Sequence, residues 1–323
     1  MKKILLLCFA CAGCIRIEPT QRITFDAPAV YPEGIAYNPA QDMFYVSSAT
    51  KGTVGRVTAQ GLYSSLYSDN TLKSTYGMKM HPDGQHLFVC VGDANYSLLS
   101  TPETKYKMAR LISIDVTTGK KLTDVDLAGL YPGKHFPNDI AFDQSANLYM
   151  TDSYSNVIYK IAPDGRAAVF ADSPMFKTQG IGLNGIVVHP DGYLLTVSSA
   201  TGNLYKVNIN NPTDVRKVAL EQFFLNGDGL LLNDNNNLTL LQNGGTDKIF
   251  NLTTEDNWQS AKMTKSTLVA DRFTYPATAT MAKNDIWVMN ARFHDLEDST
   301  SIPSKKFAIQ KVVFKPLPRP KKK

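Results

Sequence analysis

The sequence has 323 residues, of which 43% are hydrophobic and 20% are charged, and its formal net charge is +5. Five of the positive charges lie in the terminal stretch KPLPRPKKK, so the rest of the chain offers no basic patch of the kind that binds nucleic acid. The composition is that of a globular protein and argues against a nucleic-acid partner.

Residues 1–13, MKKILLLCFACAG, have the organisation of a bacterial signal peptide. Their apolar run is about half as long as a bilayer-spanning helix. The stretch CAGC resembles a lipobox, which predicts that Cys14 is lipidated and becomes the new N-terminus. We therefore expect a protein of the bacterial cell envelope that faces the periplasm or the surface and touches the membrane only through this anchor. Ordinary secretion, with cleavage nearby, is the alternative.

The cysteines agree with export without disulfides. Cys8 and Cys11 would leave with the signal peptide and Cys14 would be acylated, so Cys90 alone would remain as a thiol. Cys90 lies in the apolar run LFVCV, which predicts a buried and unreactive side chain.

Six segments of the chain share one pattern: a short apolar strand, a turn rich in Pro, Asp, Asn and Gly, and a second strand. EGIAYNPAQDMFYVS and NGIVVHPDGYLLTVS are two of them. They begin at Glu33, Tyr76, Asn138, Asn184, Asp228 and Pro276, at intervals of 43 to 62 residues. Such intervals are typical of propeller blades.

Further strand patterns follow the hairpins, such as GTVGRVTAQG and NVIYKIAPDG, which gives about four strands in each unit. One unit would expose its faces and edges, whereas six units packed around an axis bury them. We predict an all-β fold, a six-bladed β-propeller with four-stranded antiparallel blades around a central channel. The domain would span residues 17–315, with residues 17–30 and the run FAIQKVVF completing a shared blade, and residues 316–323 would form a basic tail.

The first residue of each repeat should lie on the strand that lines the channel, so the six residues would form a ring. Four of them, Glu33, Asn138, Asn184 and Asp228, carry side-chain oxygen. This set suits Ca²⁺, which takes six to eight oxygen ligands; Mg²⁺ is the second choice, and zinc fits poorly because the ring has no His or Cys. The alternative is that these residues only bond local backbone in turns. Gly34 would let the backbone pass close to the axis.

A second polar register follows fourteen residues after the first. It holds Ser47, Cys90, Asp152, Ser198, Gln242 and Asn290. We interpret it as hydrogen bonding among the blades, with Asp152 as a candidate to support the ring.

The motifs PEGIAYNP, FPNDIAFD, LNGIVVHPDG and NGDGLLL resemble, in order and spacing, those of the senescence marker protein, gluconolactonase and luciferin-regenerating enzyme family. The resemblance extends from about residue 30 to residue 293. It implies a propeller hydrolase with one catalytic divalent metal, held by Glu33, Asn138, Asn184 and Asp228, acting on a lactone or ester. Asp228 would then be both ligand and catalytic residue.

Substrate contacts are less well defined by the sequence. No match is found for the Arg and Asn side chains with which sugar-lactonase members of that family hold their substrate. Tyr76 and Lys79 of the second repeat, His135 in GKHFPND and Arg292 in MNARF are the candidate substrate-binding residues.

Two other functions stay open at this stage. A non-catalytic propeller would bind a glycan or protein on its faces, with a structural metal or none. A propeller similar to strictosidine synthase would need no metal, and Glu33 with the two asparagines argues against it.

Overall fold

Strands make up nearly all of the regular structure. The computed structural model describes residues 21–233 and 236–317. Within these ranges the helical elements are a single short α-helix, α1 (Phe293–Glu297), and three 3₁₀ turns, η1 (Ala128–Leu130), η2 (Pro174–Phe176) and η3 (Val269–Asp271). None of the helices in this part of the chain has the length and apolar character needed to cross a bilayer.

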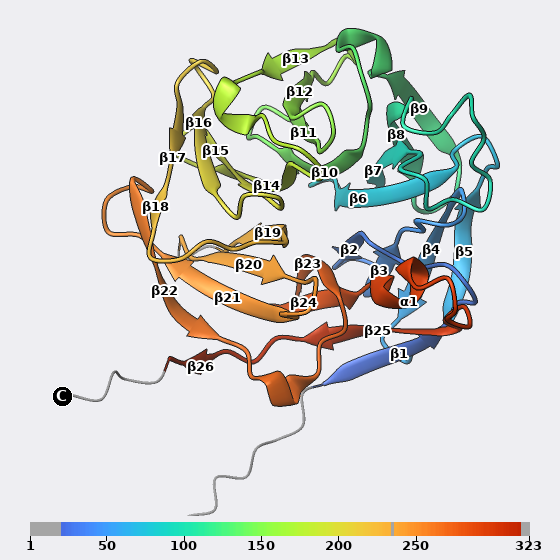
Figure 1. Ribbon diagram of the computed structural model, residues 1–323. Coiled ribbons are helices and arrows are strands. Elements are labelled where there is room, and N and C mark those ends of the chain that lie inside the picture. Colours follow the sequence, from blue (N-terminus) through green and yellow to red (C-terminus); the bar gives the residue numbers. More distant parts are fainter. Residues whose placement is uncertain (1–20, 234–235, 318–323) are drawn as a thin grey trace, which may run out of the picture.

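The strands form six sheets arranged as a ring around a central axis (Figure 1), and all pairs are antiparallel except the short β18–β22 pair. Each sheet is given from its innermost strand outward. Blade 1 consists of β2 (Ile35–Asn38), β3 (Met43–Val46), β4 (Thr53–Thr58) and β5 (Tyr63–Ser68). Blade 2 consists of β6 (Ser74–Met80), β7 (His86–Gly92), β8 (Ala109–Asp115) and β9 (Lys121–Asp126). Blade 3 consists of β10 (Pro137–Phe142), β11 (Leu148–Asp152), β12 (Val157–Ile161) and β13 (Ala167–Ala171).

The second half of the ring repeats this plan. Blade 4 consists of β14 (Leu183–His189), β15 (Tyr193–Ser198), β16 (Leu204–Asn208) and β17 (Val215–Lys217). Blade 5 consists of β19 (Gly227–Leu232), β20 (Leu238–Gln242), β21 (Lys248–Thr253) and β22 (Ser260–Ser266), with β18 (Ala219–Leu220) and β26 (Lys315–Pro316) paired to β22. Blade 6 consists of β23 (Pro276–Ala282), β24 (Asp285–Asn290), β25 (Lys306–Lys311) and β1 (Arg22–Asp26). The predicted six-bladed propeller is confirmed.

The two ends of the chain close the ring in blade 6. β1 pairs antiparallel with β25, from Arg22 opposite Gln310 to Asp26 opposite Lys306. Because one blade takes strands from both ends, opening the ring would require breaking this ladder. Pro316, the first residue of the predicted tail, lies in β26. Cys14 and the rest of the signal segment, as well as residues 318–323, lie outside the described residues.

The apolar core lies between neighbouring sheets. One cluster joins blades 4 and 5 through residues such as Leu195, Leu240 and Trp258, and another joins blades 1 and 2 through Tyr45, Leu87 and Ile112. The sheets therefore pack face to face, and the inner strands are held in place from both sides. Cys90 belongs to this buried interior, as expected.

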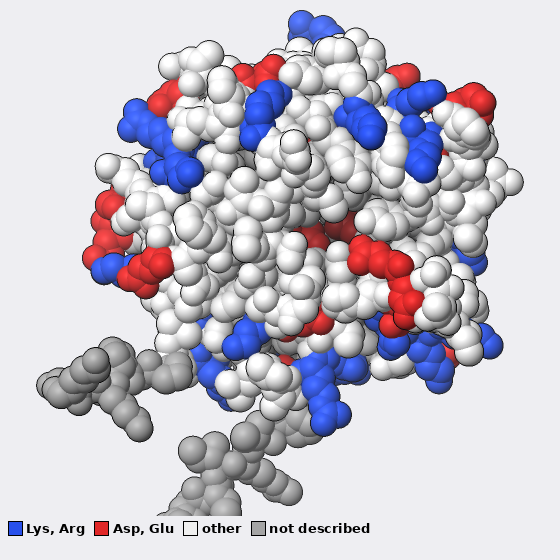
Figure 2. Space-filling view, viewed as in Figure 1, with Lys and Arg blue, Asp and Glu red and all other residues white. Residues whose placement is uncertain are grey.

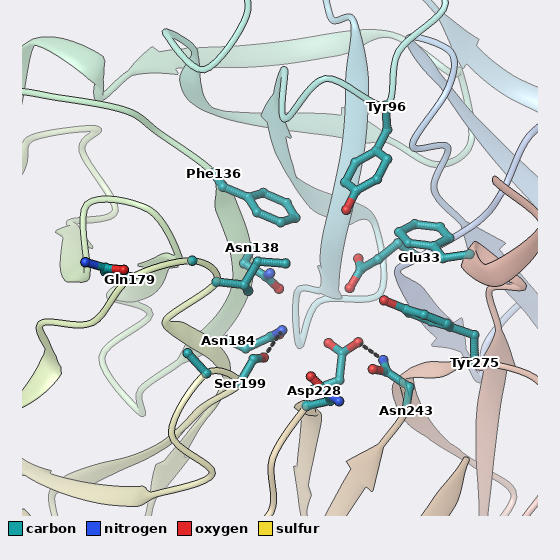
Figure 3. Close-up of a pocket in the computed structure, with 15 residues that line it drawn as sticks. Glu33, Tyr96, Phe136, Asn138, Gln179, Asn184, Ser199, Asp228, Asn243 and Tyr275 are labelled. Atoms are coloured by element: carbon teal, nitrogen blue, oxygen red, sulfur yellow. Dashed lines mark hydrogen bonds between the residues drawn. The ribbon is translucent and has the colours of Figure 1, made fainter. Parts of the chain in front are cut away.

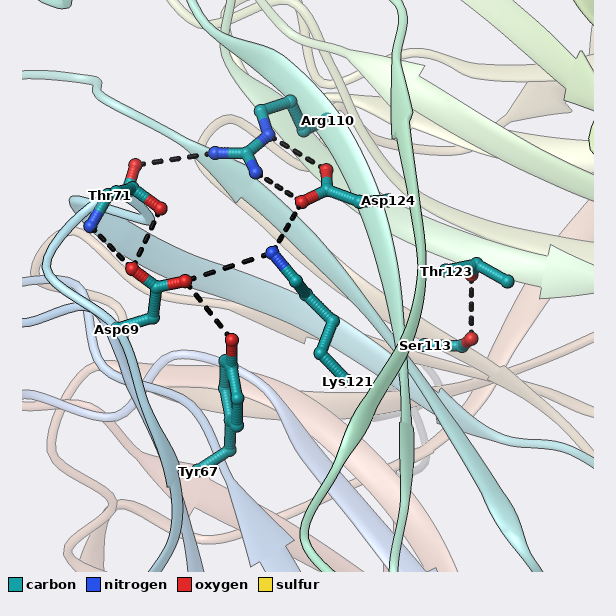
Figure 4. Close-up of polar contacts among 8 residues, drawn as sticks. All are labelled: Tyr67, Asp69, Thr71, Arg110, Ser113, Lys121, Thr123 and Asp124. Atoms are coloured by element: carbon teal, nitrogen blue, oxygen red, sulfur yellow. Dashed lines mark hydrogen bonds and ion pairs between the residues drawn. The ribbon is translucent and has the colours of Figure 1, made fainter.

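The outer strands of blades 1 and 2 are joined by charged side chains (Figure 4). Arg110 pairs with Asp124, and the Nζ atom of Lys121 lies 2.7 Å from Asp124 Oδ2 and 3.7 Å from Asp69 Oδ2. Tyr67 donates to Asp69 at 3.1 Å. These groups are partly exposed, so they contribute little to stability individually.

Candidate functional site

The inner strands approach the axis so closely that glycine is required at several positions. A Cβ atom on Gly34 would lie 2.2 Å from the carbonyl oxygen of Tyr76, and one on Gly185 would lie 2.4 Å from that of Asp228. A Cβ atom on Gly77 or Gly229 would likewise clash with a backbone carbonyl oxygen of the next blade. The reason predicted for Gly34 is confirmed, because its backbone passes the neighbouring inner strand where a side chain would clash.

A β-bulge interrupts the ladder in five of the six inner strands, and Gly77, Gly185 and Gly229 lie within three of these bulges. The register shifts between Pro137 and Ile140 in β10 and between Leu183 and Ile186 in β14, with equivalent shifts in β6, β19 and β23. The shift in β23 lies between Pro276 and Ala279. Pro276 therefore aligns with Pro137, so the ring position of blade 6 is Ala277. Its assignment to Pro276 was wrong by one residue, because the last hairpin is one residue shorter than those of blades 3 to 5.

The four predicted ring residues with side-chain oxygen line one cavity of about 230 Å³ at one end of the channel (Figure 3). Glu33, Asn138, Asn184 and Asp228 are 3–8% exposed. Ring-forming strands from blades 1, 3, 4 and 5 position them, so residues far apart in the sequence meet at the axis. Figure 2 shows acidic atoms in the central hollow of this face, whereas the basic side chains lie toward its edge.

Serine residues orient the two asparagine amides. The hydroxyl of Ser153 donates to the carbonyl of Leu183 at 2.6 Å, so it is left to accept from Asn138 Nδ2 at 3.0 Å. Ser199 similarly donates to Gly227 and accepts from Asn184 Nδ2 at 3.0 Å. The amide nitrogens therefore face the serines and the amide oxygens face away from them.

Three buried oxygens in this site lack a hydrogen-bond partner among the described residues. They are Glu33 Oε2, Asn138 Oδ1 and Asn184 Oδ1. A buried polar atom without a partner costs roughly 1–3 kcal/mol, and few survive in native proteins. Three in one cavity indicate a ligand that accepts electron pairs from oxygen.

Asp228 and Glu33 are held by side chains on neighbouring elements. Asn243 donates through Nδ2 to Asp228 Oδ2, and Thr278 donates to Glu33 Oε1 at 3.3 Å. Burial raises the pKa of Asp228 to about 8. Burial, followed by the charges of Asp228 and Asp139, raises the pKa of Glu33 well above its usual range. Without a cation, ionising both carboxyls in this cavity is unfavourable.

The residues present fit a hard divalent cation. Two carboxylates and two amide oxygens are ligands that Ca²⁺ prefers. Among the described residues that line the cavity, none is Lys, Arg or His, so no side chain of this lining offsets the two acids. A bound cation would satisfy the three unpaired oxygens and the charge together.

The structure does not bring Tyr76 and Lys79 into the lining of this cavity. Tyr76 is fully buried, its hydroxyl accepts the backbone N–H of Ala94, and its ring packs against Phe136 at 4.8 Å. Lys79 follows on the same strand, where burial lowers its pKa and the charge of Asp139 opposes that shift.

His135 and Arg292 also lie away from the lining. His135 is buried, and its Nδ1 atom lies 2.7 Å from Asp152 Oδ2. Asp152 also accepts the backbone N–H groups of Phe136 and Ser155, which indicates a structural role in fixing this loop. Arg292 is paired with Asp295, with Nη2 2.7 Å from Oδ2.

Aromatic residues from loops line the mouth instead, and the sequence patterns did not identify them. They are Tyr96, Phe136, Tyr275 and Phe293. Burial raises the pKa of both tyrosine hydroxyls, with Asp228 adding to the effect at Tyr275, so both stay protonated at neutral pH. Phe136 and Tyr275 each precede the proline next to the ring position, as Tyr31 does in YPEG, so a repeat signal was present for these two. Tyr96 and Phe293 lie in loops that carry no such signal.

The residues that support the ring were missed for a different reason. Each lies fifteen residues after its partner: Ser153 after Asn138, Ser199 after Asn184, and Asn243 after Asp228. The register taken from the sequence was fourteen residues, one short of these positions. Asp139 was also missed; it is buried next to the axis, and burial raises its pKa to about 6.

No protein-family model matches this sequence, and no curated protein matches it. Solved structures do resemble the fold. The allergen Mala s 1 of Malassezia sympodialis is 15% identical, with a TM-score of 0.69 over 90% of this chain and 95% of its own. The virginiamycin B lyase of Staphylococcus aureus is 14% identical, with a TM-score of 0.56 over 91% of this chain and 100% of its own.

A third similar structure is the PQQ-bound aldose sugar dehydrogenase of Streptomyces coelicolor. It is 12% identical, with a TM-score of 0.60 over 92% of this chain and 99% of its own. At these identities the likeness supports the propeller fold alone. The neighbours include a lyase, a dehydrogenase and an allergen, so they do not select one activity.

Proposed function

We propose that this protein is a Ca²⁺-dependent hydrolase that opens a lactone or ester in the propeller channel. The observation that carries the proposal is the set of unpaired oxygens of Glu33, Asn138 and Asn184 beside Asp228 in a buried cavity. The resemblance of the motifs around these residues to lactonases of the gluconolactonase type agrees with it.

Ca²⁺ bound to these oxygens would polarise the substrate carbonyl. The chain's own residues would supply the rest of the chemistry. Asn243 holds Asp228 Oδ2, so the carboxylate is fixed and its other oxygen is left to accept a proton from the attacking water. The oxygen of that water bonds to the carbonyl carbon, the carbon–oxygen bond of the ester breaks, and the leaving oxygen takes the proton back from Asp228. The product is a hydroxy acid, or an acid and an alcohol.

Glu33 would act as a ligand rather than a base. Thr278 holds its Oε1 atom, and its unpaired Oε2 atom is the one offered to a cation. Asn138 and Asn184 have no titratable proton, so they serve to hold the cation through oxygens that Ser153 and Ser199 orient.

The experiment is to measure Ca²⁺ binding by calorimetry and the hydrolysis of dihydrocoumarin and δ-valerolactone before and after chelation. We expect tight Ca²⁺ binding, activity that disappears with the chelator and returns with Ca²⁺, and inactive Asp228→Ala and Asn184→Ala variants. Activity that survives both the chelator and the variants would reject the proposal.

The second candidate is a propeller that binds a partner and uses the metal only to tie the blades together. The absence of His, Lys and Arg from the described lining favours it, because no cationic side chain is then in place to hold a substrate oxygen. In that case chelation lowers the melting temperature, while a broad screen of lactones and esters shows no turnover.

The lipid anchor at Cys14 remains part of the proposal for the cell envelope. The test is Cys14→Ser, which should release the protein from a bacterial membrane fraction into the soluble fraction. If the wild-type protein is also found in the soluble fraction, the result would favour ordinary secretion.

A further inference from the structure

The cavity mouth is walled by aromatic rings on opposite sides. Phe293 packs between Tyr96 and Tyr275, with ring centroids 5.3 Å from each. Phe136 stands across the cavity from Tyr96 and Tyr275 (Figure 3), and its ring packs against that of Tyr76 at 4.8 Å. Three of the rings therefore form one wall and Phe136 forms the other, with the carboxylates at the floor.

The mouth has an unfavourable charge for an anionic ligand. Besides Glu33 and Asp228, the carboxylate of Glu297 on α1 lies near enough to help raise the pKa of Tyr96 and Tyr275, after burial. None of the described lining residues is cationic. Even with a divalent cation bound, a phosphorylated or carboxylated substrate would meet no side-chain partner for its own charge.

The polar side chains of the floor are partly engaged. The amides of Asn138, Asn184 and Asn243 each donate an N–H, to Ser153, Ser199 and Asp228. Because aromatic rings form both walls, a sugar lactone would place several of its hydroxyl groups against apolar surface, which costs affinity.

Two hydroxyls are available at the mouth. Figure 3 shows the hydroxyls of Tyr96 and Tyr275 pointing toward the carboxyl groups of Glu33 and Asp228. Neither hydroxyl has a hydrogen-bond partner within the part of the chain that the structure describes. Both are therefore free to donate a hydrogen bond into the cavity.

We propose that the substrate is an uncharged cyclic ester carried on a flat apolar ring, enclosed by the aromatic walls, with Tyr96 and Tyr275 donating hydrogen bonds to its oxygen atoms. This inference rests on the proposed function. The cavity volume of about 230 Å³ suits one or two fused rings, since larger drug-sized ligands occupy roughly 300–1,000 Å³.

The first test is binding, which does not depend on turnover. The probe is 2-tetralone, a carbocyclic ketone that matches dihydrocoumarin in shape and cannot be hydrolysed, and its partner is the 6-carboxylate of the same ketone. Calorimetry on the Ca²⁺-loaded protein should show at least tenfold tighter binding of the neutral ketone. Equal or tighter binding of the carboxylate would overturn the inference.

The second test changes the walls. Tyr96→Phe and Tyr275→Phe keep the rings and remove the donors, so each should weaken 2-tetralone about threefold to tenfold without changing Ca²⁺ affinity. Tyr67→Phe, on the outer strand β5, is the matched control and should change neither. Gln179→Arg places a positive charge at the exposed edge of the cavity. It should reduce the ratio of the affinity for the neutral ketone to the affinity for its carboxylate. Unchanged ketone binding in both tyrosine variants would contradict the donor role.

Turnover separates this inference from the proposed function. Dihydrocoumarin should be hydrolysed with at least tenfold higher kcat/KM than D-glucono-δ-lactone. Binding of 2-tetralone with no turnover of any lactone would reject the hydrolase and leave the ligand class standing. Efficient turnover of the sugar lactone without binding of 2-tetralone would support the hydrolase and overturn the ligand class.

Discussion

Blades 3, 4 and 5 differ from blades 2 and 6 at the same strand position. In blades 3 to 5 the ring position holds Asn138, Asn184 and Asp228, each held by a polar side chain fifteen residues later. In blades 2 and 6 it holds the buried Tyr76 and Ala277.

Blades 2 and 6 instead reach the site through their loops. Tyr96 follows β7, while Tyr275 precedes β23 and Phe293 begins α1 after β24. The arc of blades 3 to 5 thus supplies three of the four floor residues, and Glu33 of blade 1 is the fourth. The opposite arc supplies three of the four aromatic wall residues from loops, and Phe136, just before β10, is the fourth. The comparison teaches that a repeated strand position can supply most of a polar floor, while loops of the other blades supply most of an aromatic wall.

Removing a floor residue should have the largest effect on Ca²⁺ affinity. Asp228→Ala removes a carboxylate from the proposed ligand set, so we expect Ca²⁺ affinity to fall by more than about 100-fold, beyond the effect of losing a supporting residue. Isothermal titration calorimetry measures it.

The matched control lies on the other arc. Tyr76→Phe keeps the ring that packs on Phe136 and removes a hydroxyl that accepts from Ala94 and belongs to a residue outside the cavity lining, so Ca²⁺ affinity should change less than twofold. Equal losses in the two variants would contradict the role given to Asp228.

Ca²⁺ binding should depend strongly on pH. Binding must release the proton of Asp228, whose pKa is raised by burial to about 8, and that of Glu33, whose pKa is raised well above its usual range. Apparent affinity should therefore fall at least tenfold for each pH unit below about 8. Calorimetry between pH 6 and 9 checks the slope, and a flat profile would contradict it.

The stability of the metal-free protein should change with pH in the opposite direction, decreasing as the pH rises. A carboxyl with a raised pKa stabilises the fold fully below its unfolded value of 3.8, and this contribution is lost as the pH rises toward about 8. Without Ca²⁺ the free energy of unfolding should therefore decrease between pH 4 and pH 8, and Asp228→Asn should flatten that decrease in denaturant titrations.

Loss of a supporting serine should be milder. Ser199→Ala removes the atom that accepts from Asn184 Nδ2, so the amide is free to rotate and Ca²⁺ affinity should fall about tenfold. Ser48→Ala in blade 1 is the control, because its hydroxyl donates to the carbonyl of Val30 and orients no ring side chain. A larger loss in Ser48→Ala would contradict the role given to Ser199.

Arg292→Ala should have the smallest effect. Its guanidinium pairs with Asp295, and its side chain is 42% exposed outside the cavity lining. We expect less than a twofold change in Ca²⁺ affinity and in kcat/KM for dihydrocoumarin, and a stability change within about 1 kcal/mol. A tenfold loss of kcat/KM would restore Arg292 as a substrate contact.

Periodicity by itself determined the architecture and the floor of the site. A hairpin pattern repeated six times admits few folds, and residues at one position of such a repeat must meet at the axis. For this reason Glu33, Asn138, Asn184 and Asp228 could be placed together before any coordinates, and Gly34 could be given its reason.

Only the tertiary structure decided what surrounds that floor. The last hairpin is one residue shorter than those of blades 3 to 5, which moved Pro276 out of the ring. Ser153, Ser199 and Asn243 lie one residue beyond the register taken from the sequence. Tyr96, Tyr275 and Phe293 come from loops whose paths depend on packing between blades, and His135 turned toward Asp152 because that buried carboxylate lies on the adjacent strand. Repetition specifies positions along strands, whereas loop paths and side-chain partners follow from three-dimensional packing that no single repeat contains.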